Sequence, residues 1–240
     1  HGIGRRQRQM CIRDSSDTTV ALSGDSADLA IALAGTTNHS GAVTVTDGAD
    51  YTITELKVIN AGTSGAITFS DTTVALSGDA TDLAIALAGT TNHDGAVTVS
   101  NASDYTATEL QTINNGTAGT ITLSDRTVAL SGSGTVVAAA LDGTFSGSGS
   151  HTGAVTVSGD DYTGAQLKTI NAATSGEITL SDRTVAISGD ATDLAVALGG
   201  TFAAGGSHTG AVTVSNASDY TITELKVINA GTSGAITFSD

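Results

Sequence analysis

The chain has 240 residues, with 9 basic and 24 acidic side chains, a formal charge of −15, 30 glycines, no proline, no tryptophan, one cysteine and 3% aromatic residues. So few aromatics favour a shallow core of Ala, Val, Ile and Leu, because Phe, Tyr and Trp normally supply much of the area buried in a deep core. The single cysteine excludes a disulfide framework, no run of about 18 apolar residues predicts a membrane span, and the acidic charge argues against nucleic acid as a partner.

The first residues differ in composition from the rest of the chain. Residues 5–14 read Arg-Arg-Gln-Arg-Gln-Met-Cys-Ile-Arg-Asp and hold four of the nine basic side chains. Together with Ser15, this string resembles the translation of a transposase-type sequencing-library adapter, and it lacks the apolar or amphipathic pattern of a targeting peptide. We therefore expect residues 1–16 to be a non-native, disordered leader. Without these residues, 5 basic side chains face 23 acidic ones, a formal charge of −18.

The rest of the chain consists of four tandem repeats. The repeats span residues 17–70, 71–124, 125–181 and 182–239. The strings at 50–71 and 219–240 are identical. The third and fourth repeats carry extra residues directly before His151 and His208, which indicates a surface loop. We expect Asp240 to open a fifth repeat and the chain to be a piece of a longer array.

Each repeat divides into two similar halves, and each half begins with a β-prone run. In the sequence Ala-Val-Thr-Val-Ser at 96–100, the valines alternate with small or polar residues, as in a strand with one buried face. Ile67 and Phe69 take the same places around Thr68. The pattern predicts eight such strands.

Each half ends in a predicted short helix. One set of helices begins at capping boxes, in which Thr is followed three residues later by Glu or Gln. These boxes are Thr52–Glu55, Thr106–Glu109, Thr163–Gln166 and Thr221–Glu224. In the other set, Asp79 is the expected N-cap and Asp82 lies in the first turn, where the helix dipole favours a carboxylate. The third repeat has Gly-Thr-Val-Val at 134–137 and therefore a weaker cap.

Alternating strands and short helices in tandem units predict an α/β solenoid. In this fold, strand–turn–helix units stack so that the parallel strands form one sheet and the helices line its other side. The alternative is an all-β solenoid in which the predicted helices are turns. A string of small β-sandwich domains is disfavoured, because a single repeat is short and its two aromatic side chains make a poor sandwich core.

A histidine recurs once in each repeat, two residues before a Gly-Ala-Val strand. These histidines are His39, His93, His151 and His208. Equivalent positions in successive repeats should lie two strands apart, about 9–10 Å. Since Zn–N bonds are only about 2.0–2.1 Å long, neighbouring histidines cannot share a zinc ion by stacking alone. We expect each histidine to lie in a turn and to form hydrogen bonds with the backbone.

Aspartates at the strand-to-helix turns are the better candidates for binding a cation, because Ca²⁺ prefers carboxylate and carbonyl oxygens. The main candidates are Asp79, Asp82, Asp190 and Asp193, with Asp104, Asp160 and Asp161 in similar places. Helix capping and solubility explain the same residues without a metal. We therefore assign no metal ligand set, and calcium remains an alternative.

The sequence predicts no catalytic site, because each acidic position recurs in most repeats and a single active site should break the repeat. One surface stands out instead: a threonine at the centre of each predicted strand. This ladder comprises Thr44, Thr68, Thr98, Thr122, Thr156, Thr179, Thr213 and Thr237. On an open sheet these hydroxyls would form one file, similar to the ladders of ice-binding solenoids. Small β-branched residues also suit a pleated parallel face for structural reasons alone.

Two motifs carry a resemblance to a known group of proteins. The run Tyr-Thr-x-x-Glu-Leu-x-x-Ile-Asn-x-x-Thr-x-Gly-x-Ile-Thr (51–68), followed by Val-Ala-Leu-Ser-Gly-x-x-x-Asp-Leu (74–83), resembles the repeats of giant secreted surface proteins of marine bacteria and cyanobacteria. The resemblance covers residues 17–240 and implies an extracellular or cell-surface location and an adhesive or structural role. The calcium-binding nonapeptide G-G-x-G-x-D of related adhesins does not occur in the sequence.

We therefore expect a non-enzymatic region of a long extracellular bacterial surface protein, which serves as an extended stalk or display scaffold. Its expected partners are further repeats of the same chain and, beyond them, cell-surface glycans or other cells. Nucleic-acid binding, membrane insertion and an organic cofactor are not expected. The alternatives are a ligand-binding or ice-binding face on the threonine ladder and a calcium-stabilised adhesin segment.

Overall fold

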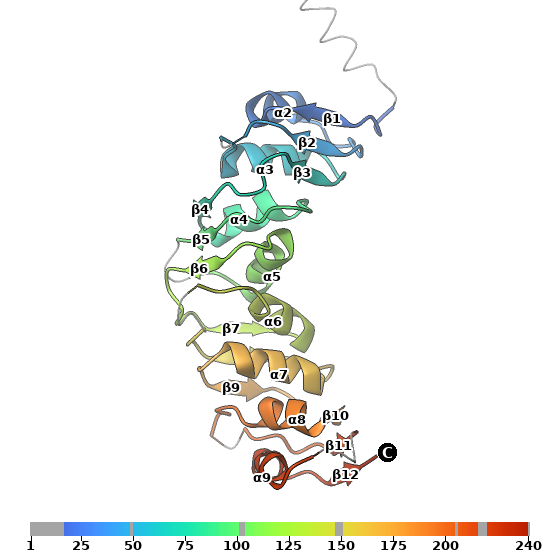
Figure 1. Cartoon of the computed structure of the whole chain (residues 1–240), viewed down its shortest axis with the longest axis vertical. Helices are drawn as coiled ribbons and strands as arrows, with labels where there is room; N and C mark the ends of the chain where they lie inside the picture. Colours follow the sequence, from blue (N-terminus) through green and yellow to red (C-terminus); the bar gives the residue numbers. More distant parts are fainter. Residues whose placement is uncertain are drawn as a thin grey trace, which may run out of the picture.

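The computed structural model describes residues 17–48, 50–100, 104–146, 151–204, 206–215 and 220–239. These residues form an elongated stack in which successive segments of the chain lie one above another along the long axis (Figure 1). The leader predicted for residues 1–16 and the Gly-Ser-Gly-Ser insertion at 147–150 lie outside the described residues.

Eight α-helices occur in the described part of the chain, alternately 8 and 10 residues long. They are α2 (Ser26–Leu33), α3 (Ile53–Gly62), α4 (Ala80–Leu87), α5 (Ala107–Gly116), α6 (Gly134–Leu141), α7 (Gly164–Ala173), α8 (Ala191–Leu198) and α9 (Ile222–Gly231). The four predicted capping boxes are confirmed at the starts of the longer helices. The all-β alternative is therefore wrong.

The shorter helices begin at a single capping side chain. Asp79 accepts a hydrogen bond from the backbone N–H of Asp82 at 2.8 Å, as the sequence predicts. In the third repeat, Ser133 takes this place and accepts from the N–H of Val136 over a longer 3.3 Å. The cap of α6 is therefore present but weaker, in agreement with the altered sequence there.

Twelve short strands occur in the described part of the chain. They are β1 (Leu22–Gly24), β2 (Val43–Val45), β3 (Ile67–Phe69), β4 (Leu76–Gly78), β5 (Val97–Val99), β6 (Ile121–Leu123), β7 (Leu130–Gly132), β8 (Val155–Val157), β9 (Ile178–Leu180), β10 (Ile187–Gly189), β11 (Val212–Val214) and β12 (Ile236–Phe238). Eight of them are the predicted strands. The other four, β1, β4, β7 and β10, have the sequence Leu-Ser-Gly or Ile-Ser-Gly and are not among the predicted strands.

The strands form four separate parallel sheets, each with three strands in chain order. Each repeat supplies one sheet, for example β4-β5-β6 in the second repeat. The number of residues between two paired positions on neighbouring strands gives the length of one turn of the chain. Leu22 pairs with Val43 in the first sheet, and Leu130 pairs with Val155 in the third. The segment between two paired residues is therefore one turn of the stack.

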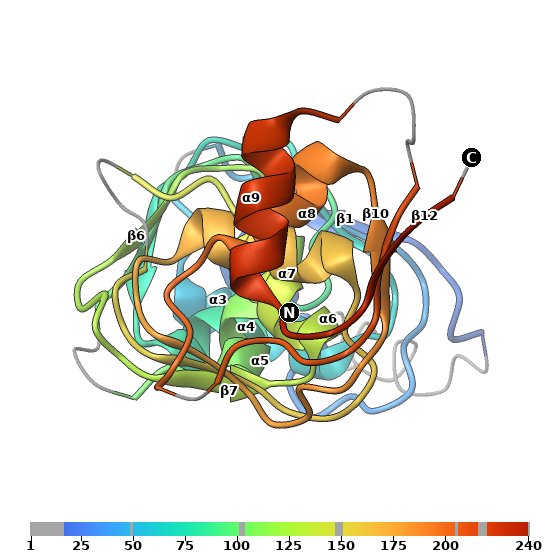
Figure 2. The ribbon, with the colours of Figure 1, turned by 90° about the horizontal axis from the view of Figure 1, so that it is seen from below.

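The expectation of one continuous sheet is wrong, and the lengths of turn and repeat explain why. Successive helices begin at Ser26, Ile53 and Ala80, a spacing that is slightly longer than one turn. As a result, β4 begins shortly after β3 ends and does not continue its sheet. Each new sheet therefore starts further around the stack. The sheet β1-β2-β3 lies on one side, β4-β5-β6 on another, and β10-β11-β12 returns to the first (Figures 1 and 2).

The repeats are nevertheless joined by hydrogen bonds and by helix packing. Single bridges link one sheet to the next turn: Ile67 with Thr90, Ile121 with Phe145 and Ile178 with Phe202. Each helix packs against the next along the chain, from α2 to α9. Seen along the long axis, the helices overlap in the middle of the outline, and the strands and connecting segments run around them (Figure 2).

The core is continuous through the stack and consists mainly of Leu, Ile, Val and Ala. The outer two residues of the predicted strands point inward, as Val97 and Val99 do, and both are fully buried. The helices contribute the apolar pairs that follow the capping boxes, such as Leu110 and Ile113. Three of the four tyrosines and Phe69 are also buried, so half of the eight aromatic side chains contribute to the core.

Candidate functional site

The threonines of the predicted ladder occupy the centres of eight strands, where their side chains are half-buried or, in Thr237, exposed. The structure brings them together only in pairs. The pairs are Thr44 with Thr68, Thr98 with Thr122, Thr156 with Thr179, and Thr213 with Thr237. In each sheet the file is completed by the serine of the preceding strand, as Ser77 stands beside Thr98.

A single file of eight threonines is therefore not formed, because successive sheets begin at different places around the stack. Each hydroxyl file spans three strands, a width of roughly 10 Å at the usual strand spacing. Some hydroxyls are also used within the chain. Thr44 and Thr68 share a hydrogen bond of 3.1 Å, and Thr213 and Thr237 share another of the same length. The arrangement offers four small hydroxyl patches and no long flat face.

The candidate cation ligands are occupied by contacts within the chain. Asp79 and Asp190 cap α4 and α8, each accepting from a backbone N–H at 2.8 Å. Asp82 forms an ion pair with Lys57 of the preceding helix. Asp193 forms the equivalent pair with Lys168. Asp82 and Asp193 thus link neighbouring turns of the stack, whereas Asp79 and Asp190 cap their own helices.

Each histidine lies between two neighbouring turns and bonds to both. The Nε2–H of His93 donates to the carbonyl of Val74 at 3.0 Å, because a carbonyl can only accept. Its Nδ1 is therefore free to accept from the hydroxyl of Thr117, which lies 2.8 Å away on the following turn. The hydroxyl in turn accepts from the backbone N–H of Gly119 at 3.0 Å. This arrangement confirms the prediction of a turn histidine that bonds to the backbone.

The same pairing occurs in all four repeats. His39, His151 and His208 contact Thr63, Thr174 and Thr232 at 2.8–3.2 Å in the same way. Burial lowers the pKa of His93, His151 and His208. At these three positions burial thus favours the neutral ring, the form that can accept a hydrogen bond at Nδ1. The threonine partners were not identified from the sequence, although a Thr-x-Gly motif recurs at a nearly constant spacing after each histidine.

The buried tyrosines make a second link across the repeat boundary. The hydroxyl of Tyr105 donates to the backbone carbonyl of Asp125, the first residue of the third repeat, at 2.6 Å. Burial, reinforced by the nearby Asp125, raises the pKa of Tyr105 to about 12. The Asp125 carboxylate accepts from the backbone N–H of Thr127 at 2.8 Å, and its hydrogen bonds with this residue lower its pKa. Repeat boundaries are thus fixed by polar bonds as well as by apolar packing.

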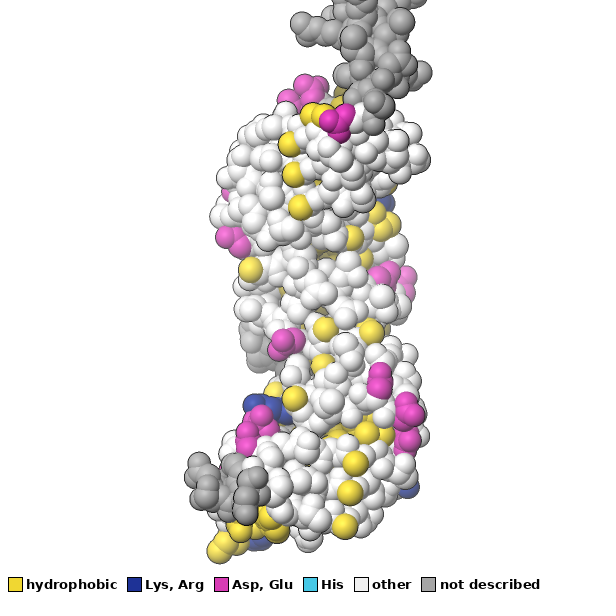
Figure 3. All heavy atoms as spheres, turned by 90° about the vertical axis from the view of Figure 1, so that its right-hand side faces the viewer, with side chains coloured by type: hydrophobic (Ala, Val, Ile, Leu, Met, Phe, Trp, Pro, Cys, Tyr) yellow, Lys and Arg dark blue, Asp and Glu magenta, His cyan; other side chains and the backbone are white. Residues whose placement is uncertain are grey.

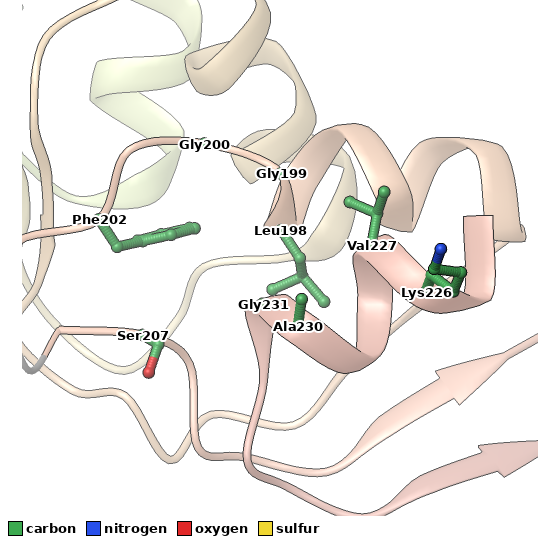
Figure 4. Close-up of a pocket in the computed structure, with 9 residues that line it drawn as sticks. All are labelled: Leu198, Gly199, Gly200, Phe202, Ser207, Lys226, Val227, Ala230 and Gly231. Carbon is green, nitrogen blue, oxygen red and sulfur yellow. The ribbon is translucent and has the colours of Figure 1, made fainter. Parts of the chain in front are cut away.

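A cavity of about 430 Å³ opens near the C-terminal end of the stack, between α8 and α9 (Figure 4). Leu198, Val227 and Ala230 line one side, and the ring of Phe202 points toward Leu198 from the other. The hydroxyl of Ser207 points away from these apolar groups. Lys226 is the single charged side chain of this lining, so no set of charged or nucleophilic groups converges in the cavity.

Among the described residues, no cluster of three or more His, Cys, Asp or Glu side chains has the geometry to hold a metal ion. No described helix combines the length and the apolar character that crossing a membrane requires. Comparison of the chain with protein-family models, with curated proteins and with solved structures finds no match.

Proposed function

We propose that the chain is a section of an extended α/β solenoid that serves as a structural or adhesive region of an extracellular bacterial surface protein. In this role it acts as a stalk or display scaffold and is not an enzyme. The observation that carries the proposal is the bonding across each repeat boundary. At the first boundary, Ile67 bonds to both Gly89 and Thr91, and the Lys57–Asp82 ion pair joins the helices. A stack linked in this way keeps a fixed length, which a spacer needs.

The distribution of polar groups supports the same function. The histidines and the three buried tyrosines bond to neighbouring turns, and the first-turn aspartates of the second and fourth repeats pair with a lysine of the preceding turn. Groups used in this way stabilise the stack and are not available to a substrate. The proposed secretion and cell-surface location are supported by the resemblance of the repeats and by the acidic composition, with a single cysteine in the predicted leader.

Surface display of tandem copies tests the proposal. One, two and three copies of residues 17–239 would be joined between a surface anchor and a terminal epitope, and the height of the epitope above the cell would be measured. A stacked array predicts that the height rises in proportion to the number of copies. A Gly/Ser linker of equal residue number is the control, because its reach grows only as about the square root of its length. Square-root growth in the repeats themselves would contradict the proposal.

The location is tested separately. Antibodies against residues 17–239 should stain intact, unpermeabilised cells of the organism that encodes the chain. Staining only after permeabilisation would contradict the extracellular part of the proposal while leaving the spacer function in place.

A further inference from the structure

Exposed apolar side chains gather at the two ends of the stack. The large hydrophobic residues that are exposed in the described chain are Val20, Ile31, Ile85, Tyr220, Ile222 and Phe238. All but Ile85 belong to the first half-repeat or the last. Figure 3 shows hydrophobic side chains together at the lower, C-terminal end of the molecule. Each end therefore presents an apolar face, and the two faces differ in sequence.

The C-terminal face is a copy of a surface that is covered inside the molecule. Residues 219–240 repeat residues 50–71 without a change. Inside the stack, Tyr51 and Phe69 are 3% and 4% exposed. At the end, their counterparts Tyr220 and Phe238 are 40% and 49% exposed. The difference is due to the second repeat, which covers the first.

The contacts between the first and second repeats show what covers this face. The side chain of Asn92 accepts from the backbone N–H of Phe69 at 2.9 Å and donates to the Phe69 carbonyl at 3.0 Å. The edge of His93 packs against Phe69, with ring centroids 5.9 Å apart. On the helix side, Asn60 donates to the carbonyl of Ile85 at 2.8 Å, beside the Lys57–Asp82 ion pair.

The N-terminal face carries the matching half of this junction. Residues 17–45 differ from residues 71–99 at only three positions, 26, 27 and 40. Asp28, Ile31, Asn38 and His39 therefore stand where Asp82, Ile85, Asn92 and His93 meet the first repeat. Asp28 and Asn38 are exposed, and Ile31 is 76% exposed compared with 40% for Ile85.

We propose that the C-terminal face of one copy of this chain binds the N-terminal face of a second copy, in the manner of the junction between the first and second repeats. Lys226 then pairs with Asp28 of the next copy, and Asn229 donates to the carbonyl of Ile31. Asn38 of the next copy bonds to the backbone of Phe238. Because the two faces differ, the contact is head-to-tail and leaves a free face at each end, so association continues into linear fibres.

One local change accompanies docking. Gly35 has a φ of +76°, a left-handed conformation that glycine adopts freely. Its counterpart Gly89, whose carbonyl accepts from the N–H of Ile67, has no positive φ. Gly35 therefore changes conformation when the strand edge of a second copy reaches it. The absence of a side chain keeps this change small in energy.

Two blocked variants of the full chain test the proposal. The first, Ile222→Lys with Phe238→Lys, places charges on the C-terminal face. The second, Ile31→Lys with Asn38→Lys, does the same on the N-terminal face. All four positions are exposed, so circular dichroism should show an unchanged fold. Thr54→Lys with Thr108→Lys, at exposed positions on interior helices, adds the same charge as a control.

Sedimentation velocity over a wide concentration range gives the readout. The unaltered chain and the control variant should grow in mass beyond a dimer, while each blocked variant alone stays a monomer. An equimolar mixture of the two blocked variants should form a 1:1 dimer with twice the monomer mass and nothing larger, since only one pair of faces remains. A monomeric unaltered chain, a blocked variant that dimerises alone or a monomeric mixture would each overturn the proposal.

Discussion

At the scale of single residues, each histidine of the repeats joins two neighbouring turns of the stack. His93 is 1% exposed and bonds through both ring nitrogens to groups on different turns. A neutral ring satisfies both partners, whereas a protonated ring would present a second N–H to the hydroxyl of Thr117 and place a charge in the core. The stability of the stack should therefore depend on the protonation of these side chains.

The first prediction is a loss of stability in mild acid. Burial lowers the pKa of His93, His151 and His208 from the ordinary value of 6.5, so unfolding takes up protons between that value and the folded pKa. The contribution of these histidines to the free energy of unfolding is fully present above pH 6.5 and is lost as the pH falls through the folded pKa. The free energy of unfolding should change by at most about 1.4 kcal/mol per pH unit for each histidine. Urea unfolding at a series of pH values measures it.

The aspartates that open the repeats do not obscure this effect. Hydrogen bonds from threonines lower the pKa of Asp71, Asp125 and Asp182 from 3.8, so their contribution is lost only in stronger acid. Below pH 6.5, the stability of the variant His93→Gln should depend less on pH than that of the unaltered chain. The difference should equal the contribution of one histidine. His151→Gln, at the equivalent buried position of the third repeat, should have the same effect. An unchanged pH dependence in His93→Gln would show that the histidines are not its cause.

At the scale of elements, neighbouring turns approach one another most closely at paired glycines before the strands. A Cβ built on Gly119 would lie 1.9 Å from the backbone carbonyl oxygen of Gly95. Gly65, Gly176 and Gly234 meet the preceding turn in the same way, at 1.8–2.0 Å. Because the obstacle is backbone, a side chain could enter only if two turns moved apart, which would disturb the ladder next to β5 and β6.

The second prediction follows from this approach. Gly119→Ala should destabilise the stack by about 3 kcal/mol, the upper end of the usual cost of overpacking, because the obstacle is backbone. Gly48→Ala is the control: nothing lies within 4 Å of its Cβ position, so the change should stay within about 0.5 kcal/mol. Urea denaturation followed by circular dichroism compares the two. Equal stability of both variants would contradict the close approach of the turns.

The elements themselves were largely predictable from the sequence, and their arrangement was not. Capping boxes and period-two runs are local patterns, and they located α3, α5 and eight strands directly. The strands with the sequence Leu-Ser-Gly were missed because a very short strand that ends in glycine has little β propensity, although Val74 and Leu76 alternate before the Asp79 cap.

The division into four sheets depends on the length of one turn relative to the half-repeat, which no single motif reveals. It arises because the half-repeat is slightly longer than one turn of the chain, and the excess accumulates at each repeat boundary. The same excess places Thr68 and Thr98 in different sheets. Whether the threonines form one file therefore could not be determined from the sequence. The histidine site was better defined, because a backbone-bonded turn histidine follows from its place before each strand.

At the scale of the whole molecule, stability should be highest in the middle of the stack. Each turn contacts only its neighbours, so an interior turn has two partners and a terminal turn has one. The effect is visible in equivalent side chains: Leu110 of α5 is 1% exposed, whereas Leu225 of α9 is only partly buried. Substitutions at equivalent positions should therefore have unequal effects along the chain.

The third prediction compares these two leucines, which follow the same capping-box position in their helices. Leu110→Ala removes a fully packed side chain between two turns and should lower the free energy of unfolding by about 2–5 kcal/mol. Leu225→Ala creates a smaller cavity next to an open face, so the loss should be clearly smaller and confined to the last repeat. Hydrogen exchange measured by mass spectrometry distinguishes the two results, since Leu225→Ala should raise exchange only near α9. If both variants raised exchange equally along the chain, the stack would unfold as one unit, and stability would not depend on the number of neighbours.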